Sequence, residues 1–217
     1  MPLPRDNMFY GFADKLTHEQ REYVDSIFDN QLTIVNAKSG TGKTTLAVAC
    51  ATLLGKPLIY TFAPVEEGKM GFRPGTQAEK ESQYHQPLID ALLEIGENPQ
   101  RAIHQPDDFD WQKSADAWIT AKSHIFMRGT NIKDSTLIIE ESQNMTRGDL
   151  KKVLTRVHET TTVIMIGHDQ QCDLADASKS GFVPYLEHFR DKPYAKVVDL
   201  TINFRGQLAQ DADALNW

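Results

Sequence analysis

The chain has 217 residues and a formal net charge of -7, with 23 Lys and Arg against 30 Asp and Glu. Its length suits one domain, and its 40% hydrophobic and 24% charged residues are typical of a folded globular protein. This composition excludes disordered, collagen-like and coiled-coil chains. The acidic balance argues against binding duplex nucleic acid through bulk charge, but it leaves room for a local basic groove.

No part of the sequence predicts a membrane span or a secretory signal. The longest apolar run, from Leu46 to Leu54, is interrupted by Thr52 and falls short of the roughly 18 apolar residues that a spanning helix needs. The N-terminal sequence MPLPRD lacks the basic start and the apolar block of a secretory signal. We therefore expect a cytoplasmic protein with no membrane partner.

Strand-like and helical patterns alternate along the chain. A helix is predicted over residues 17–28, with Thr17 as a candidate N-cap. Five short, apolar and mostly β-branched runs predict buried strands at residues 32–36, 58–62, 136–139, 162–167 and 196–200. Further helices are predicted over residues 44–55, 87–95, 111–121 and 145–157. This order predicts a single α/β domain over residues 1–217, with a parallel sheet covered on both faces and an insertion at about 63–135 after the second strand.

The strongest motif is AKSGTGKTT, residues 37–45, which lies between a predicted strand and a predicted helix as a P-loop does. In such a loop, backbone N–H groups and the positive end of the helix surround a phosphate chain, and glycines let the backbone approach closely. Lys43 would reach the β- and γ-phosphates, and Thr44 would ligate Mg²⁺. The alternative is a glycine turn followed by an amphipathic helix. The predicted nucleotide-binding residues are Ser39, Gly40, Thr41, Gly42, Lys43, Thr44 and Thr45.

A second motif, LIIEESQN, places two carboxylates at the carboxyl end of a predicted buried strand, where open α/β sheets bind their ligands. Glu140 would hold Mg²⁺ through a water molecule, and Glu141 would take the proton of an attacking water. Without the upstream P-loop, the same pair would predict only a solvated turn.

Two later motifs supply weaker candidates. In IGHDQQCDL, Gln171 would sense the γ-phosphate or orient the water, although the segment alone is typical of a polar loop. In NFRG, Arg205 would act as an arginine finger that neutralises charge on the transferring phosphoryl group. Its alternative is a surface ion pair.

Together these motifs resemble the PhoH-like family of P-loop ATPases, which is similar to the nucleotide-binding domain of superfamily 1 helicases. The resemblance spans about residues 16–204 and includes LTHEQ (16–20), PVEEGKMGFRPGTQAEKESQYHQPLIDAL (64–92), FMRG (126–129), LTR (154–156) and GHDQQCDL (167–174). It implies a three-layer RecA-like fold, and it implies that Gln20 reads the adenine of ATP. It also implies Mg²⁺-dependent ATP hydrolysis with helicase-like action on single-stranded nucleic acid, RNA more than DNA. Single-domain relatives are expected to form rings, commonly hexamers, in which Arg205 or Arg128 completes a neighbour's site.

The sequence departs from the family pattern at two acidic positions. Glu140 stands where the family has Asp, which keeps the charge and adds one methylene. His168 stands where the family has Asp after Gly, so the role of that position in coupling hydrolysis to motion is in question.

The sequence as a whole favours an oligomeric, Mg²⁺-dependent ATP hydrolase that remodels or translocates single-stranded RNA or DNA. Candidate strand contacts are the basic and aromatic residues Lys69, Phe72, Arg73, Lys80, Arg147, Lys151 and Lys152. The alternative for these charges is a solvated face. Two other functions stay open: a nucleotide-binding regulator with slow turnover, and a small-molecule kinase built on the same loop.

Overall fold

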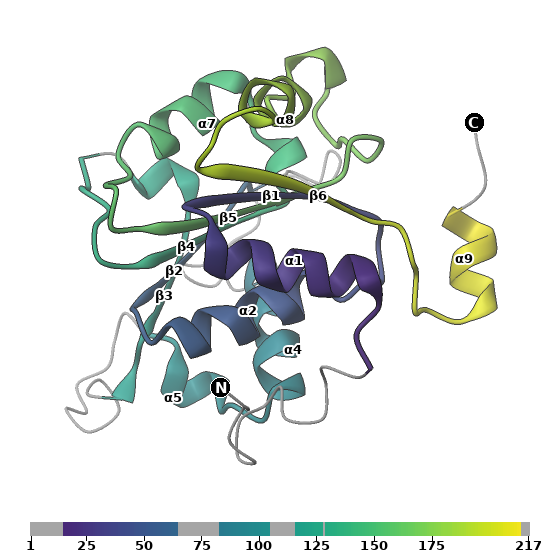
Figure 1. Ribbon diagram of the computed structural model, residues 1–217, viewed down its shortest axis with the longest axis horizontal. Coiled ribbons are helices and arrows are strands. Elements are labelled where there is room, and N and C mark those ends of the chain that lie inside the picture. The colour runs from purple at the N-terminus through teal and green to yellow at the C-terminus, as the bar shows by residue number, and fades with distance from the viewer. Residues whose placement is uncertain (1–14, 65–82, 105–115, 128, 214–217) are drawn as a thin grey trace, which may run out of the picture.

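The computed structural model describes residues 15–64, 83–104, 116–127 and 129–213. Its centre is a six-stranded sheet in which every pair of neighbouring strands is parallel and the strand order is β3-β2-β4-β5-β1-β6 (Figure 1). The strands are β1 (Leu32–Ala37), β2 (Leu58–Phe62), β3 (Ile119–Ser123), β4 (Thr136–Glu140), β5 (Thr162–Gly167) and β6 (Ala195–Leu200). The predicted α/β class and parallel sheet are confirmed.

Helices cover both faces of the sheet and so make three layers (Figure 1). One face carries α1 (His18–Asp29), α2 (Lys43–Leu54), α4 (Gln86–Glu94) and α5 (Pro99–Ala102). The other carries α7 (Arg147–Leu154) and α8 (Phe182–Phe189). Each face buries its own apolar cluster, around Tyr23 on the first and Phe182 on the second. No helix in the described ranges is long and apolar enough to cross a membrane.

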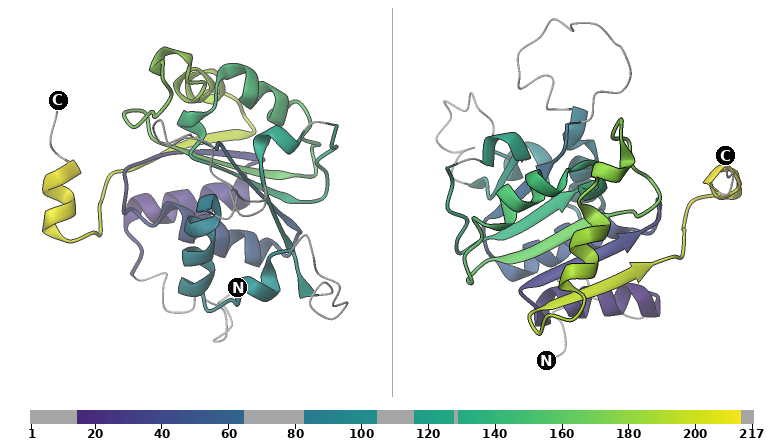
Figure 2. Two further views of the ribbon diagram at one scale, coloured as in Figure 1. Left: turned by 180° about the vertical axis from the view of Figure 1, so that it is seen from behind. Right: turned by 90° about the horizontal axis from the view of Figure 1, so that it is seen from above.

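The final helix, α9 (Gln207–Asp213), stands clear of the three layers in both views of Figure 2. Its Leu208 side chain is 85% exposed. The segment that leads to α9 leaves the sheet at the carboxyl end of β6, which is the edge that carries the candidate site.

The central strands form because most of their side chains are apolar and are buried on both faces of the sheet. All five residues of β4 are buried, as are five of the six in β1, as expected for a parallel sheet covered by helices on both sides. The predicted first helix is also confirmed: the Thr17 hydroxyl accepts from the Gln20 N–H, and the Gln20 side chain accepts from the Thr17 N–H.

The predicted helix over residues 111–121 is wrong at its C-terminal end. Ile119 begins β3, which pairs in parallel with β2 from Leu58 onward and forms one edge of the sheet. Ile119 and Thr120 are β-branched, and Ile119 is fully buried, so packing against β2 outweighs the weak helical pattern before it. The predicted insertion therefore supplies a sixth strand, together with α4 and α5, in the part of it that the structure describes.

Candidate active site

The predicted site residues come from the carboxyl ends of neighbouring parallel strands. The phosphate loop follows β1, Glu140 ends β4, Gly167 ends β5, and the NFRG segment follows β6. Because all strands point the same way, these ends share one edge of the sheet, with β5 lying between β1 and β4. Ligands of open α/β sheets bind at such an edge.

The loop after β1 has the backbone shape that its glycines permit. Gly40 and Gly42 have φ angles of 73° and 78°, in the left-handed region that favours glycine. Gly42 caps α2 with no side-chain hydrogen bond, so the first N–H groups of α2 remain available to an anion.

Two side chains from α1 donate hydrogen bonds to the backbone of this loop. The Gln20 amide donates to the Thr41 carbonyl at 3.0 Å, and the Tyr23 hydroxyl donates to the Lys43 carbonyl at 3.3 Å. Sequence reasoning gave Tyr23 no role, and the only signal for it was its place one helical turn after Gln20. Because the Gln20 carbonyl oxygen already accepts from Thr17 N–H, the remaining amide proton of Gln20 is its free donor toward an adenine. Adenine reading by Gln20 stays a prediction.

The Lys43 side chain folds over its own loop. Its ammonium donates to the carbonyl of Ala37, the last residue of β1, at 3.4 Å. This places the cation at the loop concavity, where a phosphate chain would be its natural counter-charge. Ser39 and Thr45 are half-buried beside it.

The clearest link between the two main motifs is a contact between Thr44 and Glu140. The Thr44 hydroxyl lies 3.1 Å from Oε1 and 3.2 Å from Oε2 of Glu140. Glu140 is only 2% exposed, and burial together with the neighbouring Glu141 raises its pKa to about 7, against the opposing effects of Lys43 and Thr44. A hydroxyl and a buried carboxylate next to a phosphate loop form the oxygen donor set that Mg²⁺ prefers, so these residues fit a magnesium nucleotide.

Glu141 adopts a strained backbone conformation. Its φ angle is 50°, in the left-handed region that a residue other than glycine avoids at a cost of about 1–2 kcal/mol. Such strain persists only where the surroundings enforce it, and it clusters at functional sites. Here it turns the chain out of β4 so that Glu141 is half-buried while Glu140 points into the site.

Hydrogen bonds from the turn Ser142–Asn144 link Glu141 to the loop after β5. The Gln143 side chain donates its amide N–H to Oε2 of Glu141 and accepts the His168 backbone N–H through Oε1 at 3.1 Å. The sequence analysis assigned Gln143 no role. The only sequence feature that pointed to it is its place two residues after Glu141 in the LIIEESQN motif. The predicted Gln171 is exposed in this loop, three residues beyond His168.

Arg205 lies beside the phosphate loop of its own chain. The Phe204 N–H donates to the Gly40 carbonyl at 2.9 Å, and a Cβ added at Gly40 would lie 2.6 Å from Cγ of Arg205. The structure therefore brings Arg205 to the predicted site without a second subunit. Arg128, the other arginine expected to act across an interface, lies outside the described residues.

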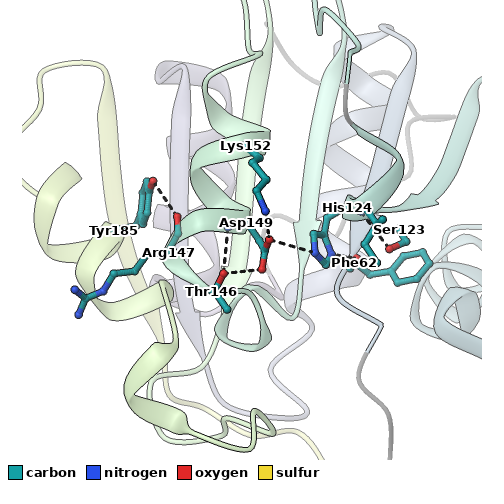
Figure 3. Close-up of polar contacts among 9 residues, drawn as sticks. Phe62, Ser123, His124, Thr146, Arg147, Asp149, Lys152 and Tyr185 are labelled. Carbon is teal, nitrogen blue, oxygen red and sulfur yellow. Dashed lines mark hydrogen bonds and ion pairs between the residues drawn. The ribbon is translucent and has the colours of Figure 1, made fainter.

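The basic face of α7 is only partly available to a partner. Figure 3 shows Asp149 joined to Thr146, to Lys152 at 2.9 Å and to His124 at 3.9 Å. Burial alone would raise the pKa of Asp149, but the hydrogen bonds from Thr146 and Lys152 and the nearby His124 lower it. Figure 3 shows the Arg147 side chain directed away from this network.

The other predicted strand contacts divide into two groups. Lys151 is exposed on α7. Lys69, Phe72, Arg73 and Lys80 lie outside the described residues.

Comparison with known proteins agrees with the motifs and the fold. The family model described as "PhoH-like protein" matches residues 13–213. The chain belongs to the PhoH family. A PhoH-like protein of Mycobacterium leprae is 32% identical over 207 residues, covering 91% of this chain and 57% of the relative. Protein PhoH2 of Bacillus subtilis is 34% identical, covering 84% and 42%, and Protein PhoH of Escherichia coli is 30% identical, covering 82% and 50%. The chain thus spans about half the length of these curated PhoH relatives.

Two solved structures with a similar fold are a helicase domain and a large terminase. The helicase domain of Pyrococcus furiosus Hef matches with a TM-score of 0.53 and 11% identity, over 92% of this chain and 40% of that one. The large terminase of bacteriophage D6E matches with a TM-score of 0.56 and 10% identity, over 91% and 49%. At these identities the likeness shows the fold alone, a P-loop domain with RecA-like layers.

Proposed function

We propose that this PhoH-family chain is a Mg²⁺-dependent ATP hydrolase whose turnover is coupled to single-stranded nucleic acid, with RNA favoured. The observation that carries this proposal is the contact between Thr44 and Glu140, which joins the phosphate loop to the end of β4. Glu141 directly follows Glu140 in the chain, which supports a role for Glu141 as the base that acts on water near the γ-phosphate.

Each of the site residues has a separate role in the proposed hydrolysis. Gly40, Gly42 and the open end of α2 present N–H groups to the phosphate chain, and Lys43 neutralises its charge. Thr44 and Glu140 would hold Mg²⁺, which supplies charge stabilisation to the phosphate oxygens when bound.

Glu141 supplies the base. It accepts a proton as the water oxygen bonds to the γ-phosphorus, and the bond between that phosphorus and the β–γ bridging oxygen breaks with its electron pair leaving on ADP. Arg205 is close enough to its own loop to stabilise the charge that develops, and Gln171 on the loop after β5 is the candidate for sensing the γ-phosphate.

Coupling to nucleic acid is supported by the fold and by local charge. The helicase domain of Hef has the same layers. The acidic chain also carries an exposed basic face on α7, where Arg147 and Lys151 enter none of the ion pairs found among the described residues. Lys152 is paired with Asp149, so we give it a smaller part in strand binding.

Assembly as a homo-oligomeric ring, a hexamer by resemblance, and a cytoplasmic location remain part of the proposal. Arg205 does not require the ring, because it already lies at the loop of its own chain. A ring would then serve to surround or track a strand.

The decisive experiment measures ATP hydrolysis by the purified chain, fractionated by size, with Mg²⁺ and with or without single-stranded RNA or DNA. We expect phosphate release that needs Mg²⁺, is lost in Lys43→Ala and Glu141→Gln, and rises with single-stranded nucleic acid. Affinity for the strand should fall steeply with added salt. A basal rate that no strand changes would remove the nucleic-acid part of the proposal.

A slow regulator is the second candidate function, and the buried Glu140 favours it. A carboxyl group whose pKa is about 7 is partly protonated near neutral pH, which weakens metal binding. Tight ATP binding with negligible phosphate release, with or without a strand, would identify this function. Phosphate transfer only in the presence of a metabolite would instead identify a kinase.

A further inference from the structure

We propose that Gln143 is a positioning residue that holds the general base Glu141 in place and ties it to the loop after β5. This inference rests on the proposed hydrolysis, because it assigns the orientation of the base in that reaction. Its foundation is the pair of hydrogen bonds that the two ends of one amide make, to Oε2 of Glu141 and to the backbone N–H of His168.

The amide of Gln143 has one arrangement that satisfies both partners. A carboxylate accepts hydrogen bonds and a backbone N–H donates one, so the nitrogen of the amide must face Glu141 and the oxygen must face His168. Gln143 is 3% exposed, so it has little freedom to exchange these partners for water. The donor to Oε2 fixes the carboxylate of Glu141 and leaves Oε1 to accept the proton of an attacking water.

Gln143 does not differ from its neighbours by anchoring the loop after β5, because Ser142 and Asn144 also anchor it. The Ser142 hydroxyl donates to the Ile166 carbonyl at 2.6 Å. Asn144 and Asp173 exchange two hydrogen bonds, at 3.0 and 2.8 Å. Among these three consecutive residues of the turn, Gln143 is the one whose side chain hydrogen-bonds to Glu141 within the described part of the chain.

The strained backbone of Glu141 makes such a support necessary. The left-handed backbone of Glu141 fixes where its side chain starts but leaves the side-chain rotamers free. A displaced base loses rate steeply, since about 1 Å of misplacement lowers turnover by about 100-fold. Holding Oε2 therefore contributes to kcat more than to nucleotide binding, which depends on the phosphate loop.

Two variants separate positioning from loop anchoring. Gln143→Glu keeps an oxygen that accepts the His168 N–H but replaces the donor to Glu141 with a second carboxylate. Gln143→Met removes both hydrogen bonds at similar volume. Positioning predicts that both variants lower kcat by about 100-fold with an unchanged dissociation constant for ATP. Loop anchoring alone predicts that Gln143→Glu keeps the wild-type kcat while Gln143→Met does not.

A double variant supplies a readout other than activity. The double variant Glu141→Gln, Gln143→Glu again pairs one donor with one acceptor, but with their places exchanged. The thermal midpoint of this double variant should therefore recover most of the loss seen in Gln143→Glu. Hydrolysis should stay absent, because the base is missing. A double variant as unstable as the sum of its single variants would show that the two side chains do not interact, which would overturn the inference.

The failures of the two proposals are distinguishable. Gln143→Glu with wild-type kcat and KM, measured beside an inactive Glu141→Gln, would overturn the positioning role alone. A wild-type chain that hydrolyses no ATP under any condition would overturn the proposed function, and the positioning role with it.

Discussion

The hydroxyl of Thr44 lies within hydrogen-bond distance of both carboxylate oxygens of Glu140, at 3.1 and 3.2 Å. Thr44 lies in the first turn of α2 and Glu140 ends β4, and 95 residues lie between them in the sequence. Their contact is the point at which two separate motifs become one site. A phosphate loop without a nearby carboxylate binds nucleotides but has no metal-side partner, so the proposed hydrolysis depends on this contact.

Replacement of Thr44 tests the metal role of this pair. We expect Thr44→Ala to lower Mg²⁺-dependent ATP turnover by about 100-fold or more, because metal assistance contributes several kcal/mol and each 1.4 kcal/mol is about tenfold in rate. Thr44→Ser keeps the hydroxyl and should retain most of the turnover. The measurement is a Mg²⁺ titration of phosphate release for both variants; equal loss in Thr44→Ser and Thr44→Ala would assign the effect to packing.

The raised pKa of Glu140 predicts a specific dependence of stability on pH. Its pKa is about 7 in the folded chain and near 4.5 in the unfolded chain, so between these values the folded state holds the extra proton. Stability without metal therefore falls as pH rises from about 4.5 to 7 and then levels off. The total change assigned to Glu140 is at most about 3 kcal/mol.

Glu140→Gln separates this contribution from those of other groups. Burial lowers the pKa of His85, so the contribution of His85 to stability rises with pH while that of Glu140 falls. The effect of Glu140 is therefore isolated by comparing the wild-type chain with the Glu140→Gln variant at each pH. We expect urea denaturation in a chelator at pH 5, 6, 7 and 8 to show wild-type stability declining relative to the Gln variant. A constant difference across this range would show that Glu140 is ionised throughout.

The sequence predicted the sheet class and five of the six strands, and it located the phosphate-loop motif, because each depends on local patterns. Buried parallel strands are continuous apolar runs, and a phosphate loop is defined by its own glycines and lysine. The sixth strand, β3, could not be predicted in this way. Its central residues Thr120, Ala121 and Lys122 are only half-buried at the sheet edge, so its apolar signal is weak and its identity comes from pairing with β2.

The missed site residues share a different cause. Tyr23 and Gln143 act through hydrogen bonds to partners whose closeness is set by the packing of α1 under the loop and of the Ser142–Asn144 turn against β5. No periodicity or spacing in a single sequence encodes such a contact. Arg205 was expected to act across an interface, but the hydrogen bond from Phe204 to Gly40 and the close approach of the Arg205 stem to Gly40 show that it lies beside its own loop.

Gly167 should tolerate no side chain. A Cβ at this position would lie 2.6 Å from the Phe182 ring and 2.7 Å from the Ser142 hydroxyl, inside the contact between β5, α8 and the turn that follows Glu141. We expect Gly167→Ala to lower the free energy of unfolding by about 1–3 kcal/mol, as overpacking does. Gly206→Ala is the matched control, because a Cβ there meets nothing within 4 Å. Urea denaturation of both variants checks this, and equal stabilities would contradict the close packing.

The placement of Arg205 decides between a site that is complete within one chain and a site shared by two subunits. The stem of Arg205 packs at Gly40 of its own phosphate loop, so we expect it to act on the nucleotide bound by its own chain. Arg205→Ala should lower kcat by about 1,000-fold or more, the effect of losing an arginine finger, with little change in ATP binding.

Mixing experiments separate the two arrangements. Lys43→Ala subunits keep Arg205 but cannot bind phosphate productively, and Arg205→Ala subunits keep Lys43. If Arg205 acts within its own chain, each subunit retains its own defect and no mixture recovers activity. Recovery at any ratio, measured as phosphate release on size-fractionated mixed oligomers, would show that an arginine crosses an interface. The conformation of residues 201–206 in such an oligomer would then have to differ from the one in which Phe204 binds Gly40.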